Sequence, residues 1–254
     1  MKKFWTKQAK EHGFDIKAVN FDPLAEELES YFLEQLIKDK DVVCDMGCGN
    51  GRTLLHLAQK LKRARFYGID FVEEMIDIAE KQKQSLHATN VNFLKLDAMS
   101  EDIQMLFSSK FNKVITKRLL INLEGVDRFK AVKNIHAILR KGGIYVMIEC
   151  FIEPLHKINQ IRKALSLEEI RVKHFNEYLD CKFLEKICSL FKIERKIDFG
   201  SLYYFTSRIY NAYLSKGKPD YFAPINKLTV KITKMGLDIL QGYSPEVIFV
   251  LKKK

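Results

Sequence analysis

The sequence predicts an α/β fold in which a mostly parallel sheet is covered by helices on both faces. Short apolar runs rich in β-branched and aromatic residues recur through the first 150 residues, and stretches with helical spacing of apolar residues separate them. This alternation is typical of parallel strands, because each strand needs a long crossover to reach the next. A chain of 254 residues suffices for one such domain and is short for two.

The strands and helices are expected in a regular order along this first part of the chain. One helix stops where Lys141, Gly142 and Gly143 follow its last apolar residue, since glycine favours the end of a helix. The expected strands are 42–46, 65–70, 91–96, 113–116 and 144–150. The helices expected between them are 53–61, 73–82 and 127–139.

Both ends of the chain depart from this order. Residues 1–37 have helical spacing and an amphipathic pattern. Near the other end we expect a helix at 181–191 and two late strands at 202–209 and 247–251, separated by a long insert. No repeat and no linker rich in proline, glycine or serine divides the chain, so one domain with appended segments is predicted. The apolar face of the first segment consists of Leu24, Leu28, Tyr31, Phe32 and Leu36.

The formal net charge of the chain is +11. Such a charge favours an anionic partner, and because the lysines are spread along predicted helices, a small anion is preferred to nucleic acid. The N-terminal residues lack the apolar core of a signal peptide and no apolar run is long enough to span a bilayer, so we expect a cytoplasmic protein without membrane insertion. The five cysteines contain no C-x-x-C pair, which predicts free thiols rather than a disulfide framework or a zinc site.

A glycine-rich turn follows the first predicted strand, with the spacing D-x-G-x-G-x-G from Asp45 to Gly51. Gly47 and Gly49 let the backbone bend sharply and approach a ligand, and Gly51 lets the next helix pack against the strand. An acid precedes the first glycine and no lysine follows the last. The spacing therefore disfavours a pyrophosphate and favours a ligand with a cationic amino-acid portion.

Acids also end the second and third predicted strands, at Asp70 and Asp97. Taken singly, each acid has a local explanation: Asp45 caps a helix, Asp70 ends a strand in water, and Asp97 starts a turn. Their order at the ends of three successive strands instead favours a nucleotide cofactor. Together with the glycine turn, residues 40–150 resemble the class I S-adenosylmethionine (SAM)-dependent methyltransferases.

The resemblance implies a Rossmann-like, seven-stranded, mostly parallel sheet with helices on both faces, an antiparallel last strand and helical lid insertions. It implies S-adenosyl-L-methionine as the cofactor and S-adenosyl-L-homocysteine as the product. The expected organisation is a single domain, 1–254, whose SAM-binding core is 40–150. Residues 1–37 form an N-terminal helical cap, and 151–180 and 209–244 are substrate-side insertions.

The same resemblance assigns the cofactor contacts. Asp70 holds the ribose hydroxyls, Asp97 meets the adenine amino group, and Ile69, Phe71 and Met99 flank the ring. The expected cofactor-binding residues are Asp45, Gly47, Cys48, Gly49, Gly51, Asp70, Phe71, Asp97, Ala98 and Met99.

The segment after the fourth strand, Arg118 to Leu123, argues against several subclasses. It lacks the Asn/Asp-Pro-Pro-aromatic turn of amino-methylating nucleic-acid enzymes, and the chain has no Pro-Cys pair of the cytosine-C5 kind. Glu149 stands without a second acid, so no metal is expected. The segment resembles instead the R-x-L-I-N-L stretch of a bacterial subgroup that acts on small metabolites, often sugars or surface-glycan precursors.

This subgroup resemblance implies the acceptor-side residues. His174 or Glu149 would act as a general base toward an alcohol, and Arg118 and Arg208 would orient an anionic acceptor. The local alternatives are a loop histidine at His174, a surface ion pair at Arg208 and a helix cap at Asn122. The expected substrate-binding residues are Asn122, Asn159, Arg162, Asn176, Tyr178, Tyr203 and Tyr204.

The predicted function is methyl transfer from SAM to a small polar or anionic acceptor, with an oxygen of a sugar, sugar nucleotide or glycan precursor as the favoured acceptor. Two alternatives remain open: a methyltransferase that acts on RNA or protein, and a SAM-binding regulatory subunit without catalysis. The sequence leaves the identity of the acceptor and the oligomeric state open.

Overall fold

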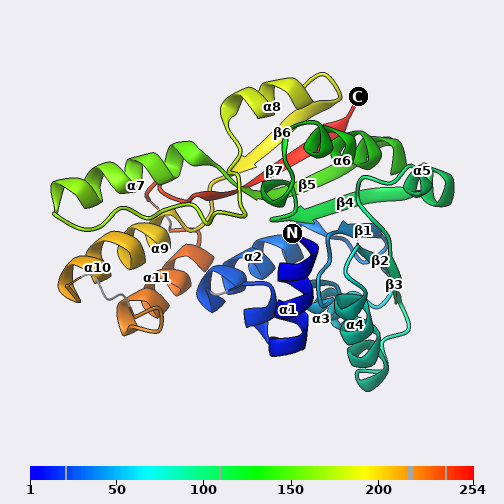
Figure 1. The fold of residues 1–254 in the computed structure, drawn as a ribbon, viewed down its shortest axis with the longest axis horizontal. Helices are drawn as coiled ribbons and strands as arrows, with labels where there is room; N and C mark the ends of the chain where they lie inside the picture. The colour runs from blue at the N-terminus through cyan, green and yellow to red at the C-terminus, as the bar shows by residue number, and fades with distance from the viewer. Residues whose placement is uncertain (21, 109, 217–219, 238) are drawn as a thin grey trace.

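The computed structural model describes residues 1–254 except 21, 109, 217–219 and 238, and its described strands form a seven-stranded sheet (Figure 1). The strand order is β3-β2-β1-β4-β5-β7-β6. Neighbours from β3 to β5 are parallel, whereas β7 runs antiparallel to both β5 and β6. This confirms the predicted α/β fold with its antiparallel last strand. The strands are β1 Val42–Met46, β2 Arg65–Asp70, β3 Val91–Lys95, β4 Phe111–Lys117, β5 Leu139–Cys150, β6 Phe191–Ile197 and β7 Glu246–Lys253.

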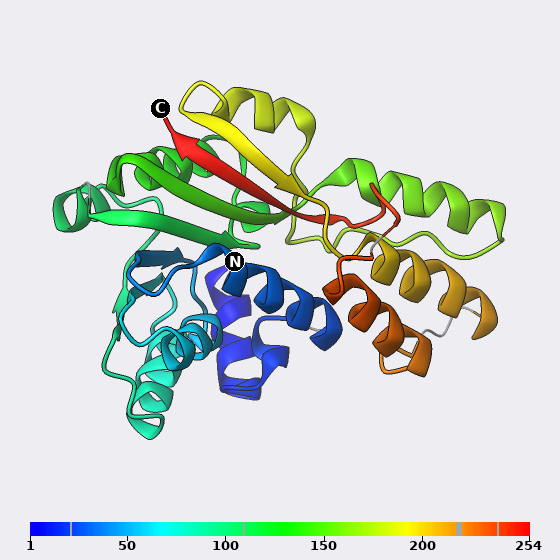
Figure 2. The same cartoon turned by 180° about the vertical axis from the view of Figure 1, so that it is seen from behind.

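Helices cover both faces of the sheet (Figures 1 and 2). Successive residues of a strand point to opposite faces, so Val43 of β1 joins the core beneath α2, α3 and α4, while Cys44 joins the core beneath α5, α6 and α8. None of the helices in the described ranges combines the length and apolarity needed to cross a membrane. The helices covering the two faces are α2 Pro23–Leu36, α3 Arg52–Lys60, α4 Glu73–Ser85, α5 Asp102–Phe107, α6 Gly125–Ile138 and α8 Cys181–Ile187.

The remaining helices gather near the carboxyl ends of the central strands, where a ligand binds in open α/β sheets (Figure 2). The N-terminal residues form α1 and the short η1, which contact each other, and α1 also lies beside α4. From the C-terminal half, α7 contacts η3, and α11 contacts α2, α9 and η3. Part of the predicted insertion 209–244, residues 217–219 and 238, lies outside the described residues. These helices are α1 Lys2–His12, η1 Ile16–Ala18, η2 Leu120–Asn122, α7 Ile152–Ala164, α9 Ser201–Phe205, η3 Thr206–Tyr210, α10 Asn211–Leu214 and α11 Pro224–Lys234.

The predicted strand at 202–209 is wrong, because these residues are helical in α9 and η3. Gly200, in the left-handed region at φ 77°, precedes the helix, and Tyr203 and Ser207 are buried one turn apart. The missed strand, β6, has charged and exposed residues along its middle. Such charge is common on an edge strand, where it discourages pairing with other chains, but it weakens the apolar signal of a strand.

Gly51, at the start of α3, adopts φ 77°, and an added Cβ would lie 2.7 Å from the Phe93 ring and 2.8 Å from the Ala79 Cβ. Gly236 has the same φ, but an added Cβ there meets no atom of the described residues within 4 Å. Strain from a left-handed backbone costs about 1 to 2 kcal/mol, and overpacking adds about 1 to 3 kcal/mol. A comparison of alanine variants at Gly236 and Gly51 therefore separates the cost of backbone strain from the cost of overpacking.

We expect Gly236→Ala to lower the free energy of unfolding by about 1 kcal/mol, because it adds only backbone strain. Gly51→Ala should lower it by about 3 kcal/mol, since overlap with Phe93 and Ala79 is added. Urea unfolding of both variants measures the difference. Equal losses would contradict the close packing of α3 against β3 and α4 at Gly51.

Candidate functional site

The glycine turn lies between β1 and α3, and its three glycines all have positive φ, between 54° and 79°. A Cβ at Gly47 would lie 2.9 Å from Leu119 Cδ1, and one at Gly49 would lie 2.8 Å from Val19 Cγ1. The turn thus fits closely between the N-terminal segment and the residues that follow β4. The backbone N–H of Gly49 donates to Asp70 Oδ2 at 3.0 Å, which joins the turn to the end of β2.

Three acids end adjacent strands beside this turn: Asp45 in β1, Asp70 in β2 and Asp97 just beyond β3. Burial raises the pKa of Asp70 to about 6, against the lowering effect of the N–H groups of Val72 and Gly49. Burial also raises the pKa of Asp45 to about 7, although Lys117 opposes it. Asp45 Oδ1 is buried without a hydrogen-bond partner among the described residues. An unsatisfied carboxylate oxygen beside a cavity indicates that a ligand supplies its donor.

A cavity of about 640 Å³ runs from these acids toward α7 and η3. It brings together most residues predicted at the cofactor and acceptor sites. Gly51 and Ile69 are not among its lining residues: Gly51 packs against Phe93 and Ala79, and Ile69 is fully buried. The predicted residues that line it are Asp45, Gly47, Cys48, Gly49, Asp70, Phe71, Asp97, Ala98, Met99, Arg118, Asn122, Asn176, Tyr178, Tyr204 and Arg208.

The structure does not support either predicted base. Glu149 is fully buried outside the cavity lining, and its carboxylate accepts the backbone N–H groups of Leu119, Leu120 and Ile121 at 3.0 to 3.3 Å. It therefore shapes the turn after β4. His174 is exposed and outside the lining, with its ring 5.2 Å from that of Phe175.

Three predicted substrate residues also lie outside the cavity lining, where they hold its walls in place. Asn159 binds both the N–H and the carbonyl of Ile170, at 2.9 and 3.0 Å. Arg162 donates to the carbonyl oxygens of Glu168 and Arg208. Tyr203 is fully buried and donates its hydroxyl to Asp22 at 2.7 Å. The contacts of Arg162 with Arg208 and of Tyr203 with Asp22 join residues 46 and 181 positions apart in sequence. Spacing along the chain therefore does not distinguish a residue that lines the cavity from one that supports its wall.

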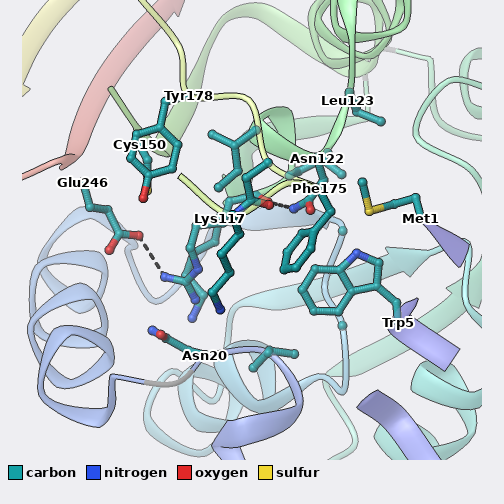
Figure 3. Close-up of a pocket in the computed structure, with 18 of the residues that line it drawn as sticks. Met1, Trp5, Asn20, Lys117, Asn122, Leu123, Cys150, Phe175, Tyr178 and Glu246 are labelled. Carbon is teal, nitrogen blue, oxygen red and sulfur yellow. Dashed lines mark hydrogen bonds and ion pairs between the residues drawn. The ribbon is translucent and has the colours of Figure 1, made fainter. Parts of the chain in front are cut away.

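A buried charge network forms the floor of the cavity at the end of β4. Lys117 Nζ lies 2.6 Å from Glu26 and 3.3 Å from Glu29, and Arg118 pairs with Glu29 and, at 2.8 Å, with Glu246. Lys117 and Glu246 line the cavity (Figure 3). Burial alone would raise the pKa of Glu26, but Lys117 and Arg118 hold it well below its usual range. Burial raises the pKa of Glu29 well above its usual value despite Arg118.

Sequence reasoning missed the acids of this network. Glu26 and Glu29 lie three residues apart and therefore on one side of the helix, whose apolar face the sequence predicted. This spacing of two acids is the feature of the sequence that indicates a shared partner. Arg118 itself has φ 56°, a left-handed conformation that is uncommon for a residue other than glycine. Its ion pairs and the contacts of Glu149 with the next three N–H groups hold this conformation.

Aromatic and charged groups meet at the far end of the cavity. The Arg208 guanidinium donates to Asp22 and lies over the rings of Tyr221 and Tyr204, with 4.7 and 5.2 Å to their centroids. Tyr204 donates its hydroxyl to Glu246 at 3.4 Å. Tyr178 points toward Glu246 and Cys150 in Figure 3. This end therefore offers hydroxyls, a carboxylate and a guanidinium to a polar ligand.

The N-terminal segment, expected from the sequence as a helical cap, places Met1, Phe4 and Trp5 in the cavity lining. Phe4 packs on Phe175, with 4.3 Å between ring centroids, and Trp5 lies beside them (Figure 3). Asn50 of the glycine turn donates to the carbonyls of Gly13 and Asp15, at 3.0 and 3.3 Å. The cap is thus tied to the turn that it covers.

The fold and the site define a class of α/β enzymes that bind a nucleotide cofactor at the end of a parallel sheet. The chain matches the family described as "Methyltransferase domain" over residues 37–182, more than half of its length. The chain belongs to this family, which confirms the enzyme class predicted from the glycine motif. S-adenosylmethionine is the methyl donor that this class implies.

Curated relatives include carboxy-S-adenosyl-L-methionine synthases. The one from Nautilia profundicola is 26% identical over 161 residues, 60% of this chain and 66% of the relative. The one from Helicobacter hepaticus is 34% identical over 121 residues, 47% of this chain and 48% of the relative. The chain thus spans about half to two thirds of the length of these relatives.

Among solved structures, geranyl diphosphate C-methyltransferase from Streptomyces coelicolor, in complex with Mg²⁺, geranyl diphosphate and S-adenosyl-L-homocysteine, has a similar fold. Its TM-score is 0.61 at 14% identity, covering 100% of this chain and 97% of that one. In this chain, the described residues contain no group of three His, Cys, Asp or Glu side chains arranged to hold a metal ion.

The raised pKa of Asp45 predicts a pH-dependent stability. An unfolded aspartate has a pKa near 3.9, so between about pH 4 and pH 7 only the unfolded chain releases this proton, and the free energy of unfolding falls as pH rises. Because the folded pKa is about 7, the loss is on the order of 4 kcal/mol.

Asp45→Asn removes this titration. We therefore expect the variant to gain stability relative to the parent as pH rises from 4 to 8, measured by urea unfolding at each pH. A stability difference that stays constant over this range would contradict the raised pKa.

Proposed function

We propose that the chain transfers the methyl group of SAM to a small polar acceptor bound at the Arg208 end of the cavity. The observation that carries the proposal is the continuity of one cavity from the three strand-end acids to Arg208, Tyr178 and Tyr204. Methyl transfer is a displacement at the sulfonium carbon, so most of the rate enhancement comes from aligning donor and acceptor in a site that excludes water.

The cofactor half suits the parts of SAM. The Asp70 carboxylate would accept the ribose hydroxyls and Asp97 would accept the adenine amino group, with Phe71 and Met99 beside the ring. All four residues line the cavity. The unsatisfied oxygen of Asp45 would accept the ammonium of the methionine portion, directly or through water. In return, an ammonium near Asp45 offsets the cost of ionising a buried carboxyl.

The acceptor half supports a polar substrate, and we propose an oxygen of a sugar, a sugar nucleotide or a glycan precursor. Lys117, Arg118 and Arg208 line this region and would orient an anionic acceptor. For an alcohol, Glu246 is the lining carboxylate that lies beside Tyr204, and it would accept the proton. A carboxylate or phosphate acceptor needs no base.

The relatives suggest a second candidate, synthesis of carboxy-S-adenosyl-L-methionine. Lys117, Arg118 and Arg208 in the cavity lining favour it, because they would also hold a carboxylate attached to the cofactor. Mass spectrometry of the ligand retained through purification separates the two candidates. Carboxy-S-adenosyl-L-methionine supports the second, and SAM or its demethylated product supports the first.

Asp70→Asn should weaken S-adenosylhomocysteine binding roughly 10- to 100-fold, because it removes charge-assisted hydrogen bonds to the ribose. Since the pKa of Asp70 is about 6, the affinity of the parent should also fall as pH drops below 6 and the carboxyl becomes protonated. Calorimetry measures both effects. Asp77→Asn, on the exposed side of α4, is the matched control, and equal affinities for the two variants would exclude Asp70 as the ribose ligand.

Arg208→Gln and Tyr178→Phe should leave S-adenosylhomocysteine affinity within about twofold but lower methyl transfer by on the order of 10²-fold, because both residues lie on the acceptor side. His174→Ala should retain full activity, since His174 is exposed outside the cavity lining. Transfer of labelled methyl from SAM to fractionated metabolites measures the rates. Full turnover in the first two variants would move the acceptor site elsewhere, and loss in His174→Ala would restore His174 as a base.

A further inference from the structure

The helix α11 turns polar side chains toward the protein and apolar side chains toward its surface, which is the reverse of a helix that covers a core. Its buried residues include the polar Asn226, Thr229 and Thr233. Its outward stripe carries Ile225 and Leu228, which are 36% and 49% exposed. A helix that turns amides and hydroxyls inward and isoleucine and leucine outward is built to cover something other than its own protein.

The apolar surface extends beyond this stripe. Of the 16 large hydrophobic side chains exposed in the described residues, nine belong to residues 210–239. The side chains of Asn211, the first residue of α10, and Asn226 in α11 both donate to the Asp220 carbonyl, at 2.7 and 2.9 Å, so the start of α10 lies near the start of α11. Figures 1 and 2 both show these helices at one corner of the molecule. We call this surface the α10–α11 patch; its main members are Tyr213, Leu214, Phe222, Ile225, Leu228 and Met235.

Positive charge borders the patch. The α11 sequence contains Lys227, Lys231 and Lys234 and no acidic residue. Their spacing of four and three residues places the lysines in a row along one side of the apolar stripe. Lys227 and Lys231 are exposed, whereas Lys234 pairs with Glu27. Exposed apolar side chains next to a row of lysines match the chemistry of an anionic lipid surface, with phosphates for the lysines and the acyl boundary for the apolar groups.

We propose that the α10–α11 patch docks the protein on the surface of an anionic lipid bilayer. A second copy is a poorer occupant, because a two-fold interface brings the same surface together from both subunits and α11 offers no carboxylate to pair with its lysines. The patch is also a helix surface that protrudes at a corner, and Ile225, Leu228 and Met235 extend along a line that a flat boundary can cover at once.

The patch adjoins the acceptor half of the cavity. Arg208 and Tyr221 line the cavity. Arg208 lies in η3, which continues into α10, and Tyr221 precedes Phe222 of the patch directly in sequence. If the chain transfers a methyl group as proposed, its acceptor is a molecule whose polar head enters the cavity and whose apolar portion stays in the bilayer.

The test is sedimentation with vesicles of phosphatidylglycerol and phosphatidylcholine in equal parts, compared with vesicles of phosphatidylcholine alone. The parent should bind the anionic vesicles at least tenfold more tightly, and the preference should weaken with salt. Ile225→Ser with Leu228→Ser should reduce binding at least tenfold through loss of apolar burial. Lys227→Ala with Lys231→Ala should reduce it by about tenfold or more.

The matched control is Met105→Ser with Leu106→Ser, which removes two exposed apolar side chains from α5 on the other side of the sheet. The control should bind vesicles like the parent, and every variant should retain its unfolding temperature and S-adenosylhomocysteine affinity. Failure of the parent to bind anionic vesicles, or binding that survives the Ile225 and Leu228 changes, overturns the proposal. A dimer that those changes dissolve would assign the patch to a second copy, and a soluble acidic protein bound in place of vesicles would assign it to that partner.

Vesicle binding and methyl transfer are measured separately, so the two proposals can fail separately. A protein that binds vesicles but transfers no methyl group keeps the docking surface and loses the proposed function. If labelled methyl appears in the water-soluble metabolites and is absent from the lipid extract, docking stands and the amphiphilic acceptor is overturned.

Discussion

The buried ion pairs between β4 and the acids of α2 and β7 are the constraint on which the site depends. Lys117 and Arg118 extend from the end of the central strand, and Glu26, Glu29 and Glu246 reach them from opposite ends of the chain. Breaking a buried pair by removing one partner typically costs about 3 to 5 kcal/mol, because the remaining charge is left without compensation. The network therefore sets where the N-terminal cap and the last strand lie relative to the cofactor turn.

The network also accounts for the unusual backbone of Arg118. The left-handed conformation at this residue turns the chain sharply after β4, and Glu149 then holds the next three N–H groups. Residues held in sparsely populated backbone regions persist where the surroundings determine them, and they cluster at functional sites. Here the turn brings Leu119 against Gly47 and places Asn122 in the cavity wall.

The C-terminal helices serve two surfaces at once. Their inner side supplies Tyr204, Arg208 and Tyr221 to the cavity, while their outer side carries the α10–α11 patch. The polar residues buried under α11 follow from this arrangement. Asn226, for example, donates to the carbonyls of Asp220 and Tyr221, so it supports the loop that brings Tyr221 to Arg208.

The sequence by itself determined the sheet up to β5, the glycine turn and the acids at the strand ends. Apolar periodicity, glycine spacing and strand ends are local features, and parallel strands bring their carboxyl ends to one edge of the sheet whatever else the chain does. It also identified residues after β4 that line the cavity, among them Arg118 and Asn122.

Only the tertiary structure decided the roles that depend on distant partners. Glu149 and His174 have the chemistry of a base, but burial against three N–H groups removes one from the cavity and exposure removes the other. Residues 202–209 have the composition of a strand, yet packing of Tyr203 and Ser207 one turn apart makes them helical. Spacing along the chain governs turns and strand ends, whereas the role of a side chain follows from neighbours that are distant in sequence, such as Asp22, 181 residues from Tyr203.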